Sequence, residues 1–329
     1  MQVKDRVLEA LEANRGTYFS GEALAQKLAV SRSAVWKAIQ QLRESGYPIE
    51  AASKRGYCLA KDSAILSAQS IAQYLTVPQL RLEVEQLVSS TNTLLRQRAE
   101  AGEPEGLALV AAAQTAGRGR RDHTFFSPPD TGLYLSFLVR PQLSAKDALL
   151  LTTCAAAAVA LAIEDCAGVP AEIKWVNDVF CRGKKVCGIL TEGALDLETG
   201  GLQYAIVGIG VNCNTDTAAL PEPARDVAVS LREAVGTAVD PNALAAAMVR
   251  RLHELDVQLP GALPQWLAEY AGVCVTLGQD VQILRAGETK QARAVGIGKD
   301  AELLVEYPDG TTESISSGEV SVRGLYGYV

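Results

Sequence analysis

The segment from residue 145 to residue 168 constrains the fold most, because it has the length of a long helix, is rich in alanine and is entirely apolar from residue 154 to residue 160. Four consecutive alanines, Ala155 to Ala158, lie at its centre. A helix that is apolar all round must be buried, and its alanines let it pack tightly against a sheet. Strands are predicted around it at residues 82–85, 107–113, 132–139, 173–180, 185–192 and 205–212. The sequence therefore predicts a central α/β domain built around this helix.

The chain has 329 residues, enough for two or three domains, and 48% of them are hydrophobic, which is ample for packed cores. It contains no uninterrupted apolar run of about 18 residues, so no membrane-spanning helix is expected. Residues 1–6 lead into an amphipathic helix rather than a signal peptide. We therefore expect a cytoplasmic protein with no membrane partner.

Cysteine and histidine usage argues against a structural zinc site and a histidine-rich metal site. The seven cysteines are scattered at positions 58, 154, 166, 181, 187, 213 and 274, and none forms a C-x-x-C pair. Several lie in apolar segments, which favours reduced core residues over a structural zinc site. The two histidines, His123 and His253, disfavour a histidine-rich metal site and a Ser-His-Asp triad.

Charge separates the first 60 residues from the rest of the chain. They hold nine Lys and Arg against six Asp and Glu, a net +3, so the remainder of a chain whose total is −7 carries −10. A basic module on an acidic body predicts nucleic-acid binding confined to the N-terminus.

The same 60 residues carry the pattern of a winged helix. Three amphipathic helices are predicted, with Ser20 and Ser31 as N-caps of the second and third. Their inward positions are Val3, Val7, Leu8 and Leu11; Ala23, Leu24 and Leu28; and Val35, Ile39 and Leu42. A β-hairpin follows, with Lys54 and Arg55 near its tip and Gly56 suited to the turn. Helix, tight turn, polar helix and basic hairpin together indicate a helix-turn-helix with a wing.

The outer face of the third helix and the wing supply the predicted DNA contacts: Arg32, Ser33, Trp36, Lys37, Gln40, Lys54 and Arg55. Lys and Arg suit phosphates, whereas Ser33 and Gln40 can reach base edges. A winged helix that binds only protein is the alternative, and the outward cations favour DNA.

The loop between the strands at 107–113 and 132–139 is the strongest sign of a ligand site. Gly117 and Gly119 alternate with arginines at 118 and 120, and a third arginine follows at 121. Glycine lets backbone amides approach a ligand, and arginine offers fixed charge and planar donors to carboxylate or phosphate. A flexible basic loop or nucleic-acid patch is the alternative. Its place between two strands favours a lid that holds a carboxylate and a nucleotide phosphate together.

Other polar positions have both a structural and a functional interpretation. The run Ser90-Thr91-Asn92 begins a predicted helix, where it either caps the helix or hydrogen-bonds a neutral polar ligand. Asp178 is either a turn residue or a site residue, and Lys185 is either an edge-strand charge or a site cation. Their combination favours a site.

With these motifs in view, the sequence resembles the bacterial biotin protein ligases, in particular the bifunctional biotin ligases that also repress the biotin operon. The resemblance covers essentially the whole chain. Its ordered motifs are the winged helix, Ser90-Thr91-Asn92, Gly117 to Arg121, Lys174-Trp175-x-Asn177-Asp178, Lys185-x-x-Gly188-Ile189-Leu190, Gly208-Ile209-Gly210-Val211-Asn212, Gly298 to Val305 and Ser317-Gly318-Glu319-Val320.

The resemblance implies three domains: a winged helix-turn-helix at 1–62, a class II synthetase-like α/β catalytic domain with a mixed sheet at 63–270, and an SH3-like β-barrel at 271–329. Short alternating strands such as Val273 to Leu277 suit the barrel, as do turn signals at Gly278, Asp300 and Asp309-Gly310.

The resemblance also implies an activity. Biotin attacks the α-phosphate of ATP, with Mg²⁺ present, to give biotinyl-5′-AMP and pyrophosphate. A lysine of the biotin carboxyl carrier protein of acetyl-CoA carboxylase then attacks the anhydride. The adenylate is also a corepressor that favours a homodimer able to bind operator DNA. Joining two anions requires fixed cations and Mg²⁺, and the reactive anhydride requires a closed loop that excludes water.

The resemblance assigns roles residue by residue. It implies catalytic roles for Arg118, Arg120 and Lys185. It implies biotin binding by Ser90, Thr91, Asn92, Gln114, Arg118, Gly119, Arg120, Lys185 and Gly188. It implies nucleotide binding by Arg121, Phe125, Asn177, Asp178, Asn212 and Arg323, with Asp178 as the candidate partner of magnesium carried by ATP.

The sequence departs from the family in two places. Asp122-His123-Thr124-Phe125 stands where the family loop usually continues Gly-Arg-x-Trp, which predicts weaker retention of the adenylate rather than lost activity. Val176 replaces a usual proline, which should matter less.

Two further functions stay open. The first is a winged-helix sensor without catalysis, which the loop arginines and the site lysine disfavour. The second is a lipoate or octanoate ligase on the same fold, which the polar group predicted for the biotin head disfavours.

Overall fold

The computed structural model describes residues 2–61, 63–75, 80–120, 123–144, 147–196, 198, 200–285, 288–316 and 321–323, with residue 148 and the last three given by their backbone only. The chain divides into two compact units. The first comprises residues 1–76 and 240–246, and the second residues 77–239 and 247–329.

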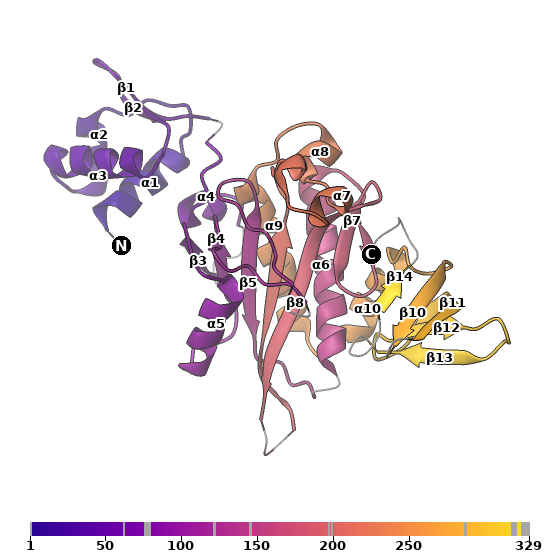
Figure 1. Cartoon of the computed structure of the whole chain (residues 1–329). Coiled ribbons are helices and arrows are strands. Elements are labelled where there is room, and N and C mark those ends of the chain that lie inside the picture. Colours follow the sequence, from indigo (N-terminus) through magenta and orange to yellow (C-terminus); the bar gives the residue numbers. More distant parts are fainter. Residues whose placement is uncertain are drawn as a thin grey trace. The chain divides into compact units, whose positions relative to one another are not determined.

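The first unit holds a winged helix and one further short helix (Figure 1). Its elements are α1 (Val3–Glu12), α2 (Gly21–Leu28), α3 (Arg32–Glu44), β1 (Ile49–Ala52), β2 (Gly56–Leu59) and α4 (Ala68–Ala72). Ser20 and Ser31 cap α2 and α3 by accepting amide protons from the first turns, at 3.0 and 3.1 Å, as predicted. β1 and β2 pair antiparallel, and Lys54 and Gly56 in the turn take φ values of 64° and 99°.

The predicted apolar faces form the core of this unit, with one exception. Its buried members include Val7, Leu8, Leu11, Leu24, Leu28, Val35, Ile39 and Leu42, with Val3 packed against them. The prediction for Ala23 was wrong, because that residue is exposed and Ala25 is buried instead. A helix turns about 100° per residue, so the face centred on Leu24 and Leu28 passes closer to Ala25 than to Ala23.

The second unit is built on a seven-stranded mixed sheet, which confirms the predicted fold class. Its strands are β3 (Arg81–Glu85), β4 (Leu107–Ala111), β5 (Leu133–Val139), β6 (Glu172–Lys174), β7 (Asp178–Cys181), β8 (Lys184–Leu195) and β9 (Leu202–Val211). They lie in the order β3-β4-β5-β9-β8-β7-β6. β3 and β4 run parallel, and the other neighbours run antiparallel.

Different helices cover the two faces of this sheet. On β8, Glu192 hydrogen-bonds to the first turn of α5 (Thr91–Glu100), and Thr191 hydrogen-bonds to Thr152 of α6 (Ala148–Ala167). Successive side chains of a strand point to opposite faces, so α5 and α6 lie on opposite sides of the sheet. The face that carries α5 also carries the predicted ligand loop and the side chains that it contacts.

The predicted alanine-rich helix is α6. Its residues Leu149–Ala167 make it the one described helix that is long and apolar enough to cross a membrane. However, 67% of that window is buried inside the protein. It packs against α10 (Leu263–Gly272) and the sheet, and this burial accounts for its apolar surface.

Four further helices and a second sheet complete the elements of the described residues. The helices are η3 (Thr217–Ala219), α7 (Ala224–Val227), α8 (Leu231–Val235) and α9 (Pro241–Gln258). The strands are β10 (Asp280–Arg285), β11 (Glu288–Ile297), β12 (Leu303–Glu306), β13 (Thr312–Ile315) and β14 (Ser321–Arg323). They form an antiparallel sheet in the order β13-β12-β11-β10-β14. Closure of this sheet into a barrel and the domain boundaries at 62 and 270 stay predictions.

Two strand predictions were wrong. Residues 173–180 form two strands, β6 and β7, because the chain reverses in a tight turn at residues 175–177. No glycine marks that turn, so the sequence reads as continuous alternation. Residues 273–277 form turns, in which Cys274 makes an isolated bridge to Ile173. Cys274 and Thr276 are buried, and their burial produces the alternation without a strand.

Candidate active site

The glycine- and arginine-rich loop folds back on itself as a short hairpin. The amide of Gly119 donates to the carbonyl of His123 at 2.7 Å, and the amide of Phe125 donates to the carbonyl of Gly117 at 3.0 Å. A β-carbon on residue 117 would overlap the Phe125 carbonyl and the Ser127 hydroxyl. Only glycine fits there, so the sequence dictates this close approach.

Three of the side chains predicted to bind the biotin head, Thr91, Asn92 and Gln114, form one hydrogen-bonded chain through Ser136. Thr91 donates its amide and hydroxyl protons to Gln114 Oε1, at 2.8 and 3.2 Å. The hydroxyl of Ser136 lies 2.8 Å from Thr91 Oγ1 and 2.6 Å from Asn92 Oδ1. Gln114 Nε2 donates to the hydroxyl of Ser127 at 3.0 Å. Buried polar groups that satisfy one another in this way fix each other's orientation.

Glu192 extends this chain to the arginine loop. Its two carboxylate oxygens accept from Asn92 Nδ2 and from Arg118 Nη1, each at 2.8 Å. The Arg118 side chain is 41% exposed, so this ion pair adds little stability. Its consequence is geometric, because a continuous series of side chains now runs from Gln114 to Arg118.

Ser90 occupies the N-cap position of α5, yet its side chain makes no capping hydrogen bond. It is 3% exposed beside Thr91 and Asn92. Capping, the structural interpretation of this run, therefore does not account for the Ser90 hydroxyl.

Gly188 and Gly210 are paired neighbours on β8 and β9 and form a floor beneath the loop. The ring of Phe125 rests on this floor, and a β-carbon on residue 210 would overlap it. The same ring meets Tyr134 edge-on, with centroids 6.3 Å apart. Burial raises the pKa of Tyr134, which keeps its phenol protonated. The two glycines thus permit the close approach of the Phe125 ring to the sheet.

Two predicted site cations pair with residues from neighbouring parts of the chain. Lys185 pairs with a residue of β7, and Arg120 bonds to a residue of the turn between β6 and β7. Lys185 Nζ lies 2.7 Å from Asp178 Oδ1, with side chains 23% and 16% exposed. Arg120 Nη1 donates to Asn177 Oδ1 at 2.8 Å, and Asn177 Nδ2 donates to a β8 carbonyl at 2.8 Å. The structure therefore brings all three predicted catalytic cations, including Arg118, to the face of the sheet that carries the glycine floor.

The other predicted nucleotide-side residues are less completely described. Asn212 follows β9, and its backbone amide donates to the Val186 carbonyl at 2.9 Å. Arg121 lies outside the described residues, as does the neighbouring departure at Asp122. Arg323 is placed in β14 by its backbone alone. The residues Ser317 to Val320, which belong to the last motif, also lie outside the described residues.

Among the described residues, no cluster of three His, Cys, Asp or Glu side chains suits a metal ion. The oxygen donors that contact Lys185 and Arg120 include the Asp178 carboxylate and the amide oxygen of Asn177. One carboxylate with substrate phosphates is a common setting for Mg²⁺, so these residues fit a magnesium ion that arrives with a nucleotide.

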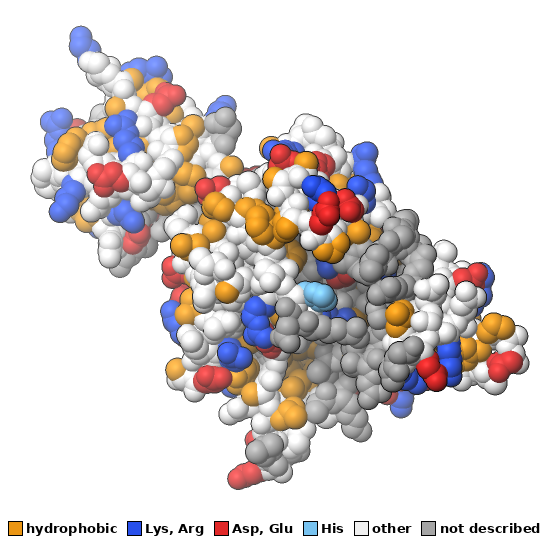
Figure 2. All heavy atoms as spheres, viewed as in Figure 1, with side chains coloured by type: hydrophobic (Ala, Val, Ile, Leu, Met, Phe, Trp, Pro, Cys, Tyr) orange, Lys and Arg blue, Asp and Glu red, His pale blue; other side chains and the backbone are white. Residues whose placement is uncertain are grey.

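The predicted DNA contacts lie on the outer surface of the winged helix. Arg32, Ser33, Trp36, Lys37, Lys54 and Arg55 are exposed, and Gln40 is half-buried. Trp36 is the most open large apolar side chain of α3, at 57% exposure. Figure 2 shows Lys or Arg side chains at the tip of the projecting β1–β2 hairpin.

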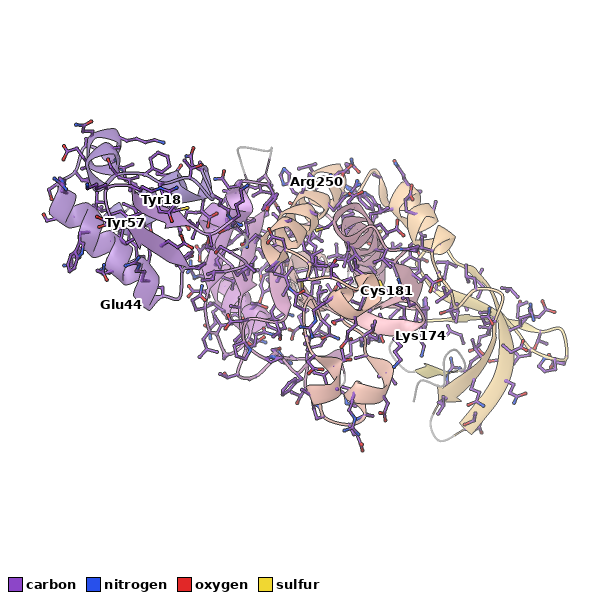
Figure 3. All side chains as sticks on the ribbon, turned by 90° about the horizontal axis from the view of Figure 1, so that it is seen from above. Tyr18, Glu44, Tyr57, Lys174, Cys181 and Arg250 are labelled. Atoms are coloured by element: carbon purple, nitrogen blue, oxygen red, sulfur yellow. The ribbon has the colours of Figure 1, made fainter. Side chains whose placement is uncertain are left out.

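A tyrosine supports the wing. The Arg55 guanidinium lies 3.9 Å from the centroid of the Tyr18 ring, and the Tyr18 hydroxyl donates to Glu50 at 2.5 Å. Figure 3 shows Tyr18 near Tyr57 of β2, and the bridge between Phe19 and Tyr57 ties the two segments together. This cation–π contact orients one of the predicted phosphate contacts.

Sequence reasoning missed three members of the site: Ser127, Ser136 and Glu192. Ser136 is fully buried in β5. A serine in the middle of an otherwise apolar strand signals a polar partner, and this signal was available in the sequence. The sequence gives no comparable signal for Ser127 or Glu192, because only the fold brings them beside Gln114 and Arg118.

Three protein-family models match the chain. They are the HTH domain at residues 4–58, the Biotin/lipoate A/B protein ligase family at 84–212 and the Biotin protein ligase C terminal domain at 276–323. These segments correspond to the winged helix, most of the seven-stranded sheet and the second sheet.

The similarity to characterised proteins extends over nearly the full length. The chain is 31% identical over 315 residues to the bifunctional ligase/repressor BirA of Bacillus subtilis, covering 94% of this chain and 96% of that protein. It is 31% identical over 322 residues to the bifunctional ligase/repressor BirA of Escherichia coli, covering 96% of each. The biotin protein ligase of Aquifex aeolicus, solved in complex with biotin and ATP, matches 74% of this chain and 98% of its own at 30% identity, with a TM-score of 0.63.

Proposed function

Because the chain belongs to the family of bifunctional biotin ligases and repressors, we propose that it is a biotin–[acetyl-CoA-carboxylase] ligase whose winged helix also represses transcription. The observation that carries the ligase half is the hydrogen-bonded chain from Gln114 to Arg118. It joins buried polar side chains suited to a neutral polar head to a cation suited to a carboxylate. Biotin has both groups at the required ends.

In the first step, a biotin carboxylate oxygen attacks the α-phosphorus of ATP. The bond from that phosphorus to the bridging oxygen breaks, and pyrophosphate leaves with the electron pair. Arg118, Arg120 and Lys185 supply the positive charge that lets the two anions approach. No nucleophilic side chain takes part, so the rate comes from positioning and electrostatics.

In the second step, the neutral amine of a carrier lysine attacks the carbonyl carbon of biotinyl-5′-AMP. The bond to the phosphate oxygen breaks, AMP leaves, and an amide forms with loss of one proton. The carrier is the biotin carboxyl carrier protein of acetyl-CoA carboxylase. The arginine loop closes over the adenylate until the carrier arrives, which protects the anhydride from water.

The individual roles proposed here are those that the resemblance to the family implies, and the grouping of the described side chains on one face of the sheet supports them. Biotin is bound by Ser90, Thr91, Asn92, Gln114, Arg118, Gly119, Arg120, Lys185 and Gly188. The nucleotide is bound by Phe125, Asn177, Asp178 and Asn212, together with Arg121 and Arg323. A magnesium ion carried by ATP neutralises phosphate charge when it is bound, and Asp178 is the residue that would hold it.

The winged helix binds operator DNA through the exposed cations of α3 and the hairpin. The adenylate acts as corepressor by favouring a homodimer, so that DNA binding rises when carrier is scarce. The protein works in the cytoplasm and has no membrane partner.

The test is mass spectrometry of the ligand retained by the purified protein after incubation with Mg-ATP and biotin, lipoate or neither. Biotinyl-5′-AMP formed only with biotin is the expected result. Adenylate formed from lipoate alone would indicate a lipoate ligase on the same fold. Adenylate from neither acid would leave a winged-helix sensor and overturn the ligase proposal.

A further inference from the structure

The turn between β6 and β7 is held in place by residues that follow it by about 100 positions in the sequence. The amide of Trp175 donates to Thr276 Oγ1 at 2.9 Å, and its indole Nε1 donates to the Ala301 carbonyl at 3.2 Å. The hydroxyl of Tyr270 donates to the Val176 carbonyl at 3.2 Å. All three bonds are buried.

Backbone bonds extend this contact to the preceding strand. The amide of Ile173 donates to the Val273 carbonyl at 2.8 Å, and the amide of Val275 donates to the Ile173 carbonyl at 2.9 Å. β6 is the edge strand of the seven-stranded sheet, so residues 273–275 cover that edge. Figure 3 shows Lys174 on the side of the second unit where the C-terminal sheet lies.

Ala301, whose carbonyl accepts the indole proton of Trp175, has an uncommon backbone conformation. Its φ is 64°, a left-handed conformation that alanine rarely adopts, and the residue is fully buried. The surrounding structure must over-determine such a conformation for it to persist. Its carbonyl accepts the Trp175 indole proton in that conformation.

Two predicted site residues lie where the turn meets β7: Asn177 is the last residue of the turn, and Asp178 is the first residue of the strand. Asn177 accepts from Arg120 at 2.8 Å, and Asp178, the next residue, pairs with Lys185 at 2.7 Å. A displacement of the turn would therefore move the partners of both cations at once. Shifts of about 1 Å in such partners are enough to change rates substantially.

We propose that Thr276 and Tyr270 are positioning residues for the nucleotide half of the ligase site, acting through the turn at residues 175–177. Thr276 and Ala301 belong to the segment that contains the second sheet, so that segment sets the geometry of the Arg120–Asn177 and Lys185–Asp178 pairs. Among the described residues, Thr276 and Tyr270 make no hydrogen bond to the chain from Gln114 to Arg118, so the geometry of that chain should be unaffected. This inference rests on the proposed function, because it assumes that Asn177 and Asp178 face the nucleotide.

The test compares Thr276→Val with Thr276→Ser in the full-length protein. Valine has nearly the shape of threonine but cannot accept the Trp175 amide proton, whereas serine can. Biotin-dependent exchange between pyrophosphate and ATP gives KM for each substrate, and calorimetry with the unreactive α,β-methylene analogue of ATP gives its Kd. Thr276→Val should raise KM for ATP and Kd for the analogue roughly tenfold, with a smaller rise in KM for biotin, because Arg120 and Lys185 are also assigned to the biotin carboxylate. Thr276→Ser should restore wild-type values.

Thr153→Val is the matched control for loss of a buried threonine hydroxyl. Thr153 is fully buried in α6, and its hydroxyl bonds to the carbonyls of Leu149 and Leu150 in the same helix. It should lower Tm without changing either KM. An equal rise in KM for ATP in Thr153→Val would mean that lost stability explains the effect, and the proposal would fail.

Tyr270→Phe provides a second route should Thr276→Val not fold. It removes the bond to Val176 and keeps the ring, so KM for ATP should again rise by a larger factor than KM for biotin. A folded Thr276→Val or Tyr270→Phe protein with unchanged analogue binding would overturn the proposal. Absence of exchange in the unaltered protein would overturn the proposed function itself, which is a different result.

Discussion

The side-chain amide of Asn92 lies directly against the backbone of Gly208, so that a β-carbon on residue 208 would overlap Asn92 Oδ1. Asn92 stands in the first turn of α5 and Gly208 in the middle of β9, more than 100 residues later. Only glycine allows the amide to reach both Ser136 and Glu192 from this position.

Gly208→Ala should therefore act on the biotin pocket. The new methyl group displaces the Asn92 amide, and we expect KM for biotin to rise at least tenfold while KM for ATP changes less. Overpacking of this kind also costs about 1–3 kcal/mol of stability. Steady-state kinetics and a thermal melt measure the two effects. Gly210→Ala is the control, because its methyl group would meet Phe125 instead. Equal effects on biotin from both variants would contradict the assignment of Asn92.

Ser136→Ala tests a residue that the sequence analysis missed. Its hydroxyl is fully buried and lies within hydrogen-bond distance of Thr91 and Asn92. A buried group left without its partner costs about 1–3 kcal/mol, so biotin should bind roughly tenfold more weakly. Ser63→Ala is a matched control, since the buried Ser63 hydroxyl has no hydrogen-bond partner among the described residues. Titration calorimetry with biotin would contradict the prediction if Ser136→Ala bound it as tightly as Ser63→Ala does.

The altered loop predicts faster loss of the adenylate. His123 accepts the Gly119 amide through its carbonyl at the turn of the hairpin, next to Asp122, which lies outside the described residues. The double change Asp122→Gly and His123→Arg restores the usual family composition and removes one negative charge. We expect the off-rate of trapped biotinyl-5′-AMP to fall several-fold. A dissociation time course that is the same for both proteins would count against this role of the loop.

The support of Arg55 by Tyr18 predicts how the wing binds DNA. Arg55→Ala removes one cation, so affinity should fall for all sequences alike and the slope of log K against log salt should shrink by about one. Tyr18→Phe keeps the ring beneath Arg55 and should have a smaller effect than Tyr18→Ala. Ligase kinetics should be unchanged in all three. A salt slope that stays constant in Arg55→Ala would exclude a phosphate contact at this position.

Features set by neighbouring residues could be predicted from the sequence, whereas features set by residues distant in the sequence could not. Local signals were reliable: the serine caps at Ser20 and Ser31, the hairpin at Gly56 and the buried helix α6 are all confirmed. Long-range signals were not available. The turn at 175–177 is stabilised by Thr276 and Ala301, and Glu192 meets Arg118 only because β8 lies beside the loop. Alternation at 273–277 misled for the same reason, since burial against β6 imitates a strand.

Asp256 gives the protein a stability that depends on pH. Burial raises the pKa of this α9 carboxyl from 3.8 to about 6, with a smaller contribution from the charge of Glu105. The unfolded chain loses the proton near its ordinary pKa, so between these two values the folded protein binds more protons. Stability therefore falls as pH rises through this window, and the full penalty is present above about pH 6. A shift of this size sets an upper limit of about 3 kcal/mol, and solvent screening reduces it to roughly 1 kcal/mol.

Asp256→Asn should remove that penalty. The free energy of unfolding should rise by about 1 kcal/mol at pH 8 and change much less at pH 4, where the folded Asp256 carboxyl is protonated. Denaturant titrations at the two pH values provide the measurement. Asp280→Asn is the control, because that carboxylate is 86% exposed and its removal should change stability by less than about 0.5 kcal/mol at either pH. A stabilisation of Asp256→Asn that is equal at pH 4 and pH 8 would show that packing, rather than the buried charge, is responsible.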